Sequence, residues 1–387
     1  MEIPQELWRK NYEESQILTS DNLAAAKRNG KWGFVNQNGK EICPFKYDGT
    51  FPFINGTAAV KIGNLWGVLN TAGKEIVPVY YDQVFTFSEG LIKVKKNGKF
   101  GFVNTKGELT IPVIYDDADR FSERMAAVKI NGKAGFINTK GKEVIPFVYD
   151  DADSFSEGLA PVKNNELWGF INKKNELIIP YKYEGTEGFF DGVAKVIHNN
   201  YWGIINPNDE VIIPFQYDEI IGFNNGFTPV MKAEKWGYAN AQGELICELK
   251  YDEAAEFDDN GEFAAVMIAE KWGFINAKGE EIVPLQYDEV SEFCNEMAAV
   301  CKDELWGFVN AKGEEVFSPQ FDDVESFQEK GMTLGFIGEE PFILFENGKK
   351  ATLTIDTINF KFKGYNMRHP LYHVGFVYYN NNPVLNK

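Results

Sequence analysis

The chain has 387 residues, of which 44% are hydrophobic and 15% aromatic, enough apolar material for an extensive core. It carries 39 basic and 57 acidic residues, and this formal net charge of −18 would repel a nucleic acid backbone. No segment reaches about 18 consecutive apolar residues, and the first residues lack the basic and apolar regions of a secretory signal. We therefore expect a cytoplasmic protein that binds neither nucleic acids nor membranes, with its four cysteines reduced.

Residues 1–18 precede a repeated pattern that starts at residue 19. Pro4 is followed by a segment in which Trp8 and Tyr12 are spaced to share one face of a helix. The terminal unit of a repeat array needs a cap over its open apolar end. We therefore predict that residues 1–18 form a helical N-terminal cap.

From residue 19 onward the sequence repeats itself around a Trp-Gly-Phe-Val-Asn stretch at 32–36. The first position of this stretch returns in steps of 34 residues, with one step of 36, at Trp66, Phe100, Ala134, Trp168, Trp202, Trp236, Trp272 and Trp306. A fixed period of this size is typical of a repeat architecture, in which neighbouring units stack and bury a continuous core. We therefore expect a single array over residues 19–334.

Each unit contains three short apolar runs bounded by turn residues, which indicates three strands. In the first unit these runs are 23–27, 32–36 and 41–44. Within the central run, Trp and the Phe two residues later share one face, and the Val that follows is apolar on the other. We expect this strand to be covered on both faces, and an aromatic ring to lie over its Gly.

Turn residues separate the three runs. Asn29-Gly30 lies between the first two runs and predicts a type I′ hairpin turn. An Asn-x-x-Gly motif separates the second and third runs and predicts a turn whose Gly is left-handed. Two units replace this Gly by Asn175 and Asp209, the residue types that best tolerate that conformation. A β-branched residue in the same position, as in Gly141→Val, should be poorly tolerated.

A Tyr-Asp pair, or a close variant of it, follows the third run of every unit, and a Phe follows the acid by five residues. Tyr47-Asp48 and Phe53 are the first example. We expect a short loop or helical turn here, with Asp capping its start. The two extra residues of the long step fall just after Phe257, where a loop would absorb them.

The pattern fades after Trp306. Asn347-Gly348 resembles a worn tenth turn, and the segments 352–363 and 374–379 alternate like strands. We expect a degenerate last repeat and a β-rich C-terminal cap over residues 335–387.

These elements predict an all-β array of about nine to ten three-stranded antiparallel units of 34 residues. An open stack, or solenoid, is the favoured arrangement. A closed β-propeller is the alternative, although its blades usually have four strands and number about four to eight. A period of 34 residues is short for four strands.

The shared pattern, Trp-Gly-(Phe/Val)-(Val/Ile)-Asn-x-x-Gly-Lys-Glu followed by Pro, Tyr-Asp and Phe, resembles the WG-repeat (KWG-repeat) family of bacterial proteins. The resemblance covers approximately residues 19–334. This chain departs from the pattern at Ala134, which replaces Trp, at Glu248 and Ser318, which replace Pro, and in its tail. The resemblance implies an interaction scaffold of bacterial origin.

Residues suited to catalysis or to metal binding are few. The chain has three histidines, and although His369 and His373 have a helical spacing, Pro370 between them argues against a helix. The motifs of nucleotide sites, hydrolase nucleophiles and paired-cysteine sites are absent from the sequence. We therefore predict no enzymatic activity, no cofactor and no metal site.

Further acidic residues follow most Tyr-Asp pairs, and they are densest at Asp117, Asp119, Asp151 and Asp153. Regular stacking would place such positions in a row along one edge of the array. These segments lack the central Gly and distal Glu of an EF-hand calcium loop. We predict that the four residues bind a protein partner, and the negative charge favours a basic one. A row that serves solubility alone is the alternative.

A rival hypothesis assigns a ligand-binding or enzymatic function to residues 351–387, around Tyr365, Arg368, His369, Tyr372 and His373. Deleting this segment would separate a functional tail from a functional array. The sequence gives no indication of the oligomeric state.

Overall fold

The computed structural model describes residues 7–16, 18–327, 331–338 and 340–352. Apart from the first two residues, the chain divides into two compact units, Ile3–Glu219 and Ile220–Lys387. This boundary falls inside the segment predicted from the sequence as one array. Among the described residues the single helix is a short 3-10 helix, η1 (Leu7–Asn11), and the regular structure is otherwise β.

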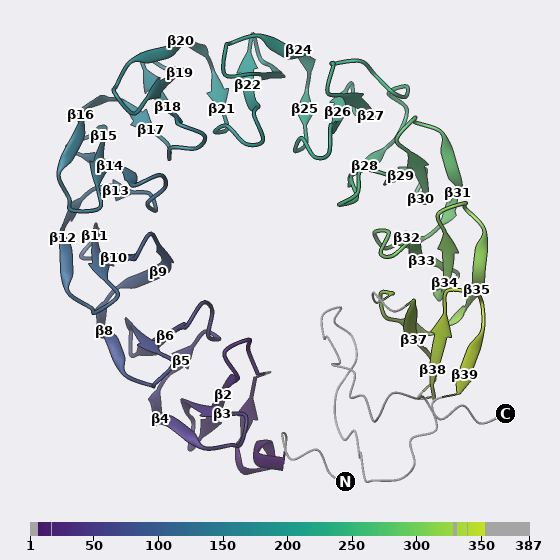
Figure 1. Cartoon of the computed structure of the whole chain (residues 1–387), viewed down its shortest axis with the longest axis horizontal. Helices are drawn as coiled ribbons and strands as arrows, with labels where there is room; N and C mark the ends of the chain where they lie inside the picture. Colours follow the sequence, from purple (N-terminus) through teal and green to yellow (C-terminus); the bar gives the residue numbers. More distant parts are fainter. Residues whose placement is uncertain (1–6, 17, 328–330, 339, 353–387) are drawn as a thin grey trace. The chain divides into compact units, whose positions relative to one another are not determined.

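Both units are built from antiparallel sheets whose strands follow one another in chain order (Figure 1). Strands β1–β24 form six four-stranded sheets in Ile3–Glu219. Strands β25–β39 form four more sheets, of which β25-β26-β27 has three strands and the others have four. None of the described sheets closes on itself.

The second and third strands of each sheet form a hairpin. The second strands are β2 (Leu23–Arg28), β6 (Thr57–Ile62), β10 (Leu91–Lys96), β14 (Met125–Ile130), β18 (Leu159–Asn164), β22 (Ala194–His198), β26 (Phe227–Lys232), β29 (Phe263–Ile268), β33 (Met297–Lys302) and β37 (Met332–Ile337). The third strands carry the Trp-Gly stretch or its counterpart: β3 (Lys31–Asn36), β7 (Leu65–Asn70), β11 (Lys99–Asn104), β15 (Lys133–Asn138), β19 (Leu167–Asn172), β23 (Tyr201–Ile205), β27 (Lys235–Asn240), β30 (Lys271–Asn276), β34 (Leu305–Asn310) and β38 (Glu340–Phe345).

The fourth strands lie at one edge of each sheet and, except in the last sheet, end on the Tyr of the Tyr-Asp pair or its Phe substitute. They are β4 (Glu41–Tyr47), β8 (Glu75–Tyr81), β12 (Leu109–Tyr115), β16 (Glu143–Tyr149), β20 (Leu177–Tyr183), β24 (Val211–Tyr217), β31 (Glu281–Tyr287), β35 (Glu315–Phe321) and β39 (Lys350–Thr352). The sheet without a fourth strand is the one in which Glu248 replaces Pro.

The first strands lie at the opposite edge and most of them have two residues. They are β1 (Glu14–Ser15), β5 (Gly49–Thr50), β9 (Gln83–Ser88), β13 (Asp117–Ala118), β17 (Asp151–Ala152), β21 (Gly185–Thr186), β25 (Glu219–Ile220), β28 (Glu253–Phe257), β32 (Glu289–Val290) and β36 (Asp323–Val324). The three longer strands per unit were predicted correctly, whereas this segment was expected to be a loop or helical turn.

Because the first strand is so short, four strands fit within 34 residues. The length argument against propeller-like blades, which are also four strands in chain order, therefore fails. The ten sheets still exceed the usual number of blades, about four to eight.

The core lies between successive sheets. Phe34 and Val35, neighbours on β3, are both fully buried, so this strand is covered on both faces as predicted. The ring of Phe34 packs edge-on against Phe53, which leads into the next sheet, at a centroid distance of 4.7 Å. In Ile220–Lys387, Phe308 and Phe327 repeat this contact at 4.9 Å. The Phe after each Tyr-Asp pair thus joins one sheet to the next.

Both predicted turns are confirmed. Asn29 and Gly30 have φ angles of 51° and 71°, as a type I′ turn requires. In the second turn, Gly39 has a φ of 73°, and its replacements Asn175 and Asp209 have φ angles of 63° and 65°. The inserted residues near Phe257 also form a turn, closed by a 2.8 Å hydrogen bond from the Gly261 N–H to the Asp258 carbonyl.

The Gly that follows Trp was expected to lie under an aromatic ring. This is right for Gly33 and Gly203, which face Phe45 and Phe215. In most other repeats the backbone of the fourth strand takes that place. A Cβ added to Gly67 would lie 2.7 Å from the Val77 carbonyl oxygen, so the strand pairing itself requires glycine there.

The chain ends differ in what can be described. In the segment predicted as an N-terminal cap, Trp8 is 5% exposed and packs against Ala24, Ala26 and Val35 of the first sheet. At the other end, the Gly348 N–H donates to the Phe345 carbonyl at 2.9 Å, which closes the predicted tenth turn. The strands expected within 353–387 lie outside the described residues.

Candidate partner-binding site

The acid of each Tyr-Asp pair links one sheet to the next. Asp116 accepts hydrogen bonds from the Lys99 ammonium of the preceding sheet and, at 2.7 Å, from the Asn131 N–H in the hairpin turn of its own sheet. Asp150 does the same with Lys133 at 2.6 Å and with the Asn165 N–H at 2.8 Å. The Lys99 hydrogen bond holds the pKa of Asp116 below its usual range. These acids are structural and do not belong to the predicted site.

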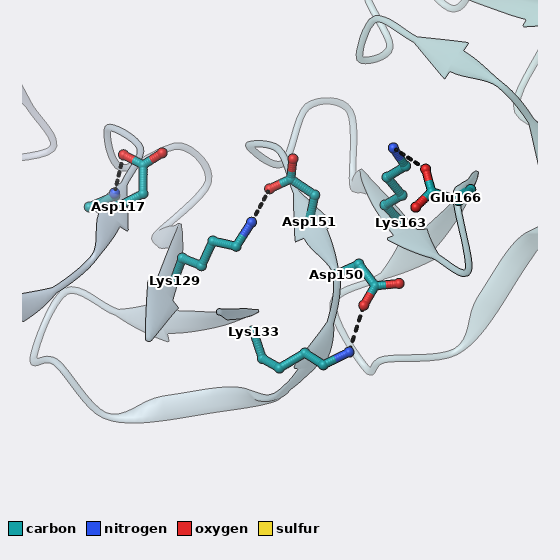
Figure 2. A network of polar contacts seen from close by, with 8 residues as sticks. Asp117, Lys129, Lys133, Asp150, Asp151, Lys163 and Glu166 are labelled. Carbon is teal, nitrogen blue, oxygen red and sulfur yellow. Dashed lines mark hydrogen bonds and ion pairs between the residues drawn. The ribbon is translucent and has the colours of Figure 1, made fainter. Parts of the chain in front are cut away.

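The next residues, Asp117 and Asp151, open the short strands β13 and β17 and are exposed (Figure 2). Each faces a lysine across the sheet, because the strand register pairs Asp117 with Lys129 and Asp151 with Lys163. The Lys129 ammonium reaches forward to Asp151 at 3.5 Å. The charge of this part of the predicted acidic row is therefore partly neutralised, which the sequence analysis missed.

Asp119 and Asp153 follow two residues later and are half-buried. The Asp153 carboxylate accepts a hydrogen bond from the Ser154 N–H at 2.6 Å. The Asp119 carboxylate has no hydrogen bond or ion pair with the described residues. Burial raises the pKa of Asp119 to about 6, and the neighbouring Asp153 raises it further against the opposing charge of Lys93. A half-buried carboxylate with these neighbours lowers the stability of the fold at neutral pH.

A small hollow of about 20 Å³ lies beside Ala134 and is lined by Asp117, Asp119, Asp151 and Lys129 together with small apolar residues. In other repeats a Trp occupies this position under a lysine: the Lys27 ammonium lies 5.5 Å from the Trp32 ring centroid. Since Ala134 has no ring, its cross-strand partner Lys129 pairs with Asp151 instead.

A larger cavity of about 380 Å³ adjoins the hollow. It is lined by Phe85, Thr86, Lys93, Asp119, Arg120, Asp153 and Ser154. The structure thus brings the four predicted residues together on two adjacent sheets, with Asp119 lining both spaces.

The sequence analysis did not identify Phe85, Lys93 or Arg120. A signal was available in the position 15 residues before each Trp. Phe51 occupies it two repeats earlier and stacks on Trp66 at 5.4 Å, and Phe85 follows at the next repeat. The change from Phe to Asp119, together with the change from Trp to Ala134, marks the repeat where the cavity lies.

The unit Ile220–Lys387 carries its own acids at equivalent positions, and these lack a lysine opposite. The register pairs Glu253 with Met267, Glu289 with Cys301 and Asp323 with Phe336. All three acids are exposed. The acidic row is therefore less neutralised in this unit than around Asp117 and Asp151.

Other candidate groups do not form a site among the described residues. No cluster of three metal-ligating side chains occurs there. His198 packs between Tyr183 and Phe215. The tail residues named in the rival hypothesis, 365–373, lie outside the described part of the chain. No helix in that part is long and apolar enough to span a membrane.

Replacing Asp119 by Asn should stabilise the protein at pH 7, by about 1 to 2 kcal/mol, since the variant no longer holds a half-buried charge. Because the pKa of Asp119 is raised on folding, the native state takes up a proton as the pH falls from 7 to 5, and the wild type gains stability. The advantage of Asp119→Asn should therefore shrink at pH 5. Urea unfolding at the two pH values measures both differences.

The exposed neighbour Asp117 provides the control, because Asp117→Asn should change the free energy of unfolding by less than about 0.5 kcal/mol at either pH. An Asp119→Asn variant that is less stable than the wild type at pH 7 would contradict the stated role of the charge.

Comparison with solved structures gives distant likenesses only. The chain is 8% identical to a structure described as a eukaryotic initiation factor, covering 81% of this chain and 88% of that one, with a TM-score of 0.43. It is 9% identical to Hsv2p of Kluyveromyces lactis, covering 65% and 88%, with a TM-score of 0.31. These scores are too low to support an argument about fold or function. The curated proteins include no match to the chain.

A family model described as "WG containing repeat" matches nine consecutive segments: residues 32–66, 66–100, 100–133, 135–168, 168–202, 202–236, 236–272, 272–306 and 306–334. The segments begin at or beside the successive Trp positions, and they tile most of the described sheets. The chain therefore belongs to the WG-repeat family.

Proposed function

We propose that this protein is a non-enzymatic scaffold of the bacterial cytoplasm that binds a basic protein along its acidic row. Asp117, Asp119, Asp151 and Asp153 form the part of the row that contacts the partner. The net charge of −18 would draw a basic protein toward the array and speed its association.

The observation that carries this proposal is the placement of Asp119. Its carboxylate is half-buried beside Asp153, has no hydrogen bond with the described residues and lowers stability at neutral pH. A positively charged group brought by a partner would relieve that repulsion, so the bound state is favoured by the same charges that strain the free one.

The cysteines support a reducing compartment. Cys43 and Cys301 are buried free thiols, and burial raises the pKa of both, which keeps them in the unreactive protonated form. Neither position suits a reactive or disulfide-forming role.

The test compares two immobilised variants that lose four negative charges each. The first is D117N/D119N/D151N/D153N, and the control, E166Q/E234Q/E270Q/E304Q, removes charges from exposed hairpin turns. Both variants and the wild type are incubated with cytoplasmic extract from the source cells, and bound proteins are identified by mass spectrometry. We expect a basic protein that the wild type and the control retain and that the Asp variant loses.

The association rate of the retained protein should then fall as salt rises from about 50 to 500 mM, since screening shortens the range of the acidic field. A third variant, with Glu253, Glu289 and Asp323 neutralised, tests whether the row extends into Ile220–Lys387. Partner retention that is indifferent to salt and to the Asp changes would leave the row a solubility feature and refute the proposal.

A further inference from the structure

The 380 Å³ cavity has the size of a small-molecule site, which commonly measures about 300 to 1,000 Å³. Its walls come from three successive sheets of the unit Ile3–Glu219. Phe85 and Thr86 lie on β9 and Lys93 on β10, Asp119 and Arg120 follow β13, and Asp153 and Ser154 follow β17. A free small molecule could therefore contact groups from three repeats at once.

The polar groups of this cavity differ in how fully they are used. The Lys93 ammonium donates to the Ala118 carbonyl at 2.7 Å and lies 4.5 Å from the Phe85 ring centroid, so it is part of the wall. The Arg120 guanidinium is exposed and has no hydrogen bond or ion pair within the described part of the chain. The Asp119 carboxylate likewise has none, and the Asp153 carboxylate accepts only the Ser154 N–H. Two carboxylates and one guanidinium are thus available to a ligand.

The charges of the lining residues determine what kind of ligand fits. Two carboxylates and two cationic side chains sum to zero, so the cavity favours neither a simple cation nor a simple anion. A cation placed against the carboxylates would also meet Arg120 and Lys93, and an anion placed against Arg120 would meet Asp119 and Asp153. A molecule that carries both charges satisfies both sets.

We propose that this cavity binds a free α-amino acid as its zwitterion. Asp119 and Asp153 accept hydrogen bonds from its ammonium group, Arg120 donates to its carboxylate, and its side chain rests against the Phe85 ring. A fork of guanidinium N–H groups suits a carboxylate, and an aromatic face suits an apolar or planar side chain. This site goes beyond the proposed scaffold function, although it shares two acids with the docking row.

The test uses three probes that differ only in charge: L-phenylalanine, phenethylamine, which lacks the carboxylate, and 3-phenylpropionate, which lacks the ammonium group. Binding to the full chain is measured by ligand-detected NMR and calorimetry near pH 7.5. We expect L-phenylalanine to bind with a Kd at least about tenfold lower than either analogue. Arg120→Ala should raise that Kd to the phenethylamine value, and D119N/D153N should raise it to the phenylpropionate value.

The matched control is D117N/D151N, which removes two neighbouring acids that do not line this cavity. It should leave L-phenylalanine binding unchanged while weakening attachment of a basic partner, so the two proposals can fail separately. Circular dichroism and thermal unfolding check that each variant is folded. Equal affinity for the three probes, a Kd unaffected by Arg120→Ala, or no binding below about 10 mM would overturn the amino acid site.

Discussion

Replacing Gly107 by Asn should lower the free energy of unfolding by about 3 kcal/mol or more, whereas the same change at Gly141 should cost about 1 kcal/mol or less. Both glycines fill the left-handed slot of the Asn-x-x-Gly turn, with φ angles of 80° and 75°. Asn tolerates that conformation at either site. The difference arises because a Cβ on Gly107 would lie 1.5 Å from the Ile76 carbonyl oxygen, whereas on Gly141 its nearest neighbour would be the Ile111 side chain at 3.2 Å.

Urea unfolding followed by tryptophan fluorescence measures the two changes. Gly141→Val provides the comparison at the tolerant site, and it should cost about 1 kcal/mol or more because a β-branched residue is strained at positive φ. If Asn proves equally mild at Gly107 and Gly141, the contact with the preceding sheet does not constrain the turn. If Val is as mild as Asn at Gly141, backbone conformation is not the reason for glycine.

This pair of glycines also marks the limit of prediction from the sequence. The left-handed conformation of the slot was predictable because Asn175 and Asp209 are the only other residues found in it. The close approach at Gly107 was not, since it depends on how far the turn of one sheet advances onto the backbone of the sheet before it. Local pattern specifies φ, and the spacing between sheets specifies which positions also lack room.

The same distinction applies to the strands. The long strands alternate or carry apolar runs, so their periodicity identifies them. Short strands such as β13 (Asp117–Ala118) are only two residues long and have no periodicity to detect. They form because the Asp116 N–H and side chain bind the next hairpin, through the Lys129 carbonyl at 2.8 Å and the Asn131 N–H at 2.7 Å. That contact joins positions 13 to 15 residues apart, and no local signal announces it.

The candidate site was half predictable. The spacing of Asp117, Asp119, Asp151 and Asp153 placed them on adjacent units, and the structure brings them together. The pairing of Lys129 with Asp151 was not predictable because Lys129 has a different partner where a Trp is present, as the contact of Lys27 with Trp32 shows. The 380 Å³ cavity requires side chains from three sheets, so it is visible only once the sheets are stacked.

The Tyr of the Tyr-Asp pair provides a second contact between sheets. The Tyr47 hydroxyl donates to Glu75 of the next sheet at 2.9 Å, and the Tyr183 hydroxyl donates to Asp209 at 2.6 Å. In both cases the preceding lysine binds the same acid: Lys46 binds Glu75 at 2.7 Å. The two acids occupy different positions, because Asp209 fills the glycine slot of its turn and Glu75 lies two residues beyond that slot.

The acceptor has therefore moved between repeats while the contact has been kept. Where Asp209 supplies the carboxylate, the position two residues later is Val211 and no longer Glu. Asn175 is likewise followed by Leu177 and accepts from the Tyr149 hydroxyl. Burial raises the pKa of Tyr183 above its ordinary range and the bond to Asp209 adds to this, so the hydroxyl stays protonated and needs an acceptor.

Asp209→Gly should accordingly lower the free energy of unfolding by about 2 kcal/mol, because the part-buried Tyr183 hydroxyl and the Lys182 ammonium both lose their acceptor. Adding Val211→Glu to this variant recreates the arrangement of Glu75 and should restore most of the loss. Val211 is 51% exposed, so the new carboxylate enters without crowding the core. Urea unfolding of the single and double variants gives both values.

A double-mutant cycle with Tyr183→Phe separates the hydrogen bond from other effects of the turn. Once the hydroxyl is gone, Asp209→Gly should cost only the part contributed by Lys182, which is half-exposed and worth less than about 1 kcal/mol. Rescue by Val211→Glu should shrink by the same amount, because the restored carboxylate has no hydroxyl to accept from. If Val211→Glu rescues stability as fully in the Tyr183→Phe variant as it does when Tyr183 is present, the acid acts on the turn itself. The exchange of acceptor positions between repeats would then not be a means of keeping the contact between sheets.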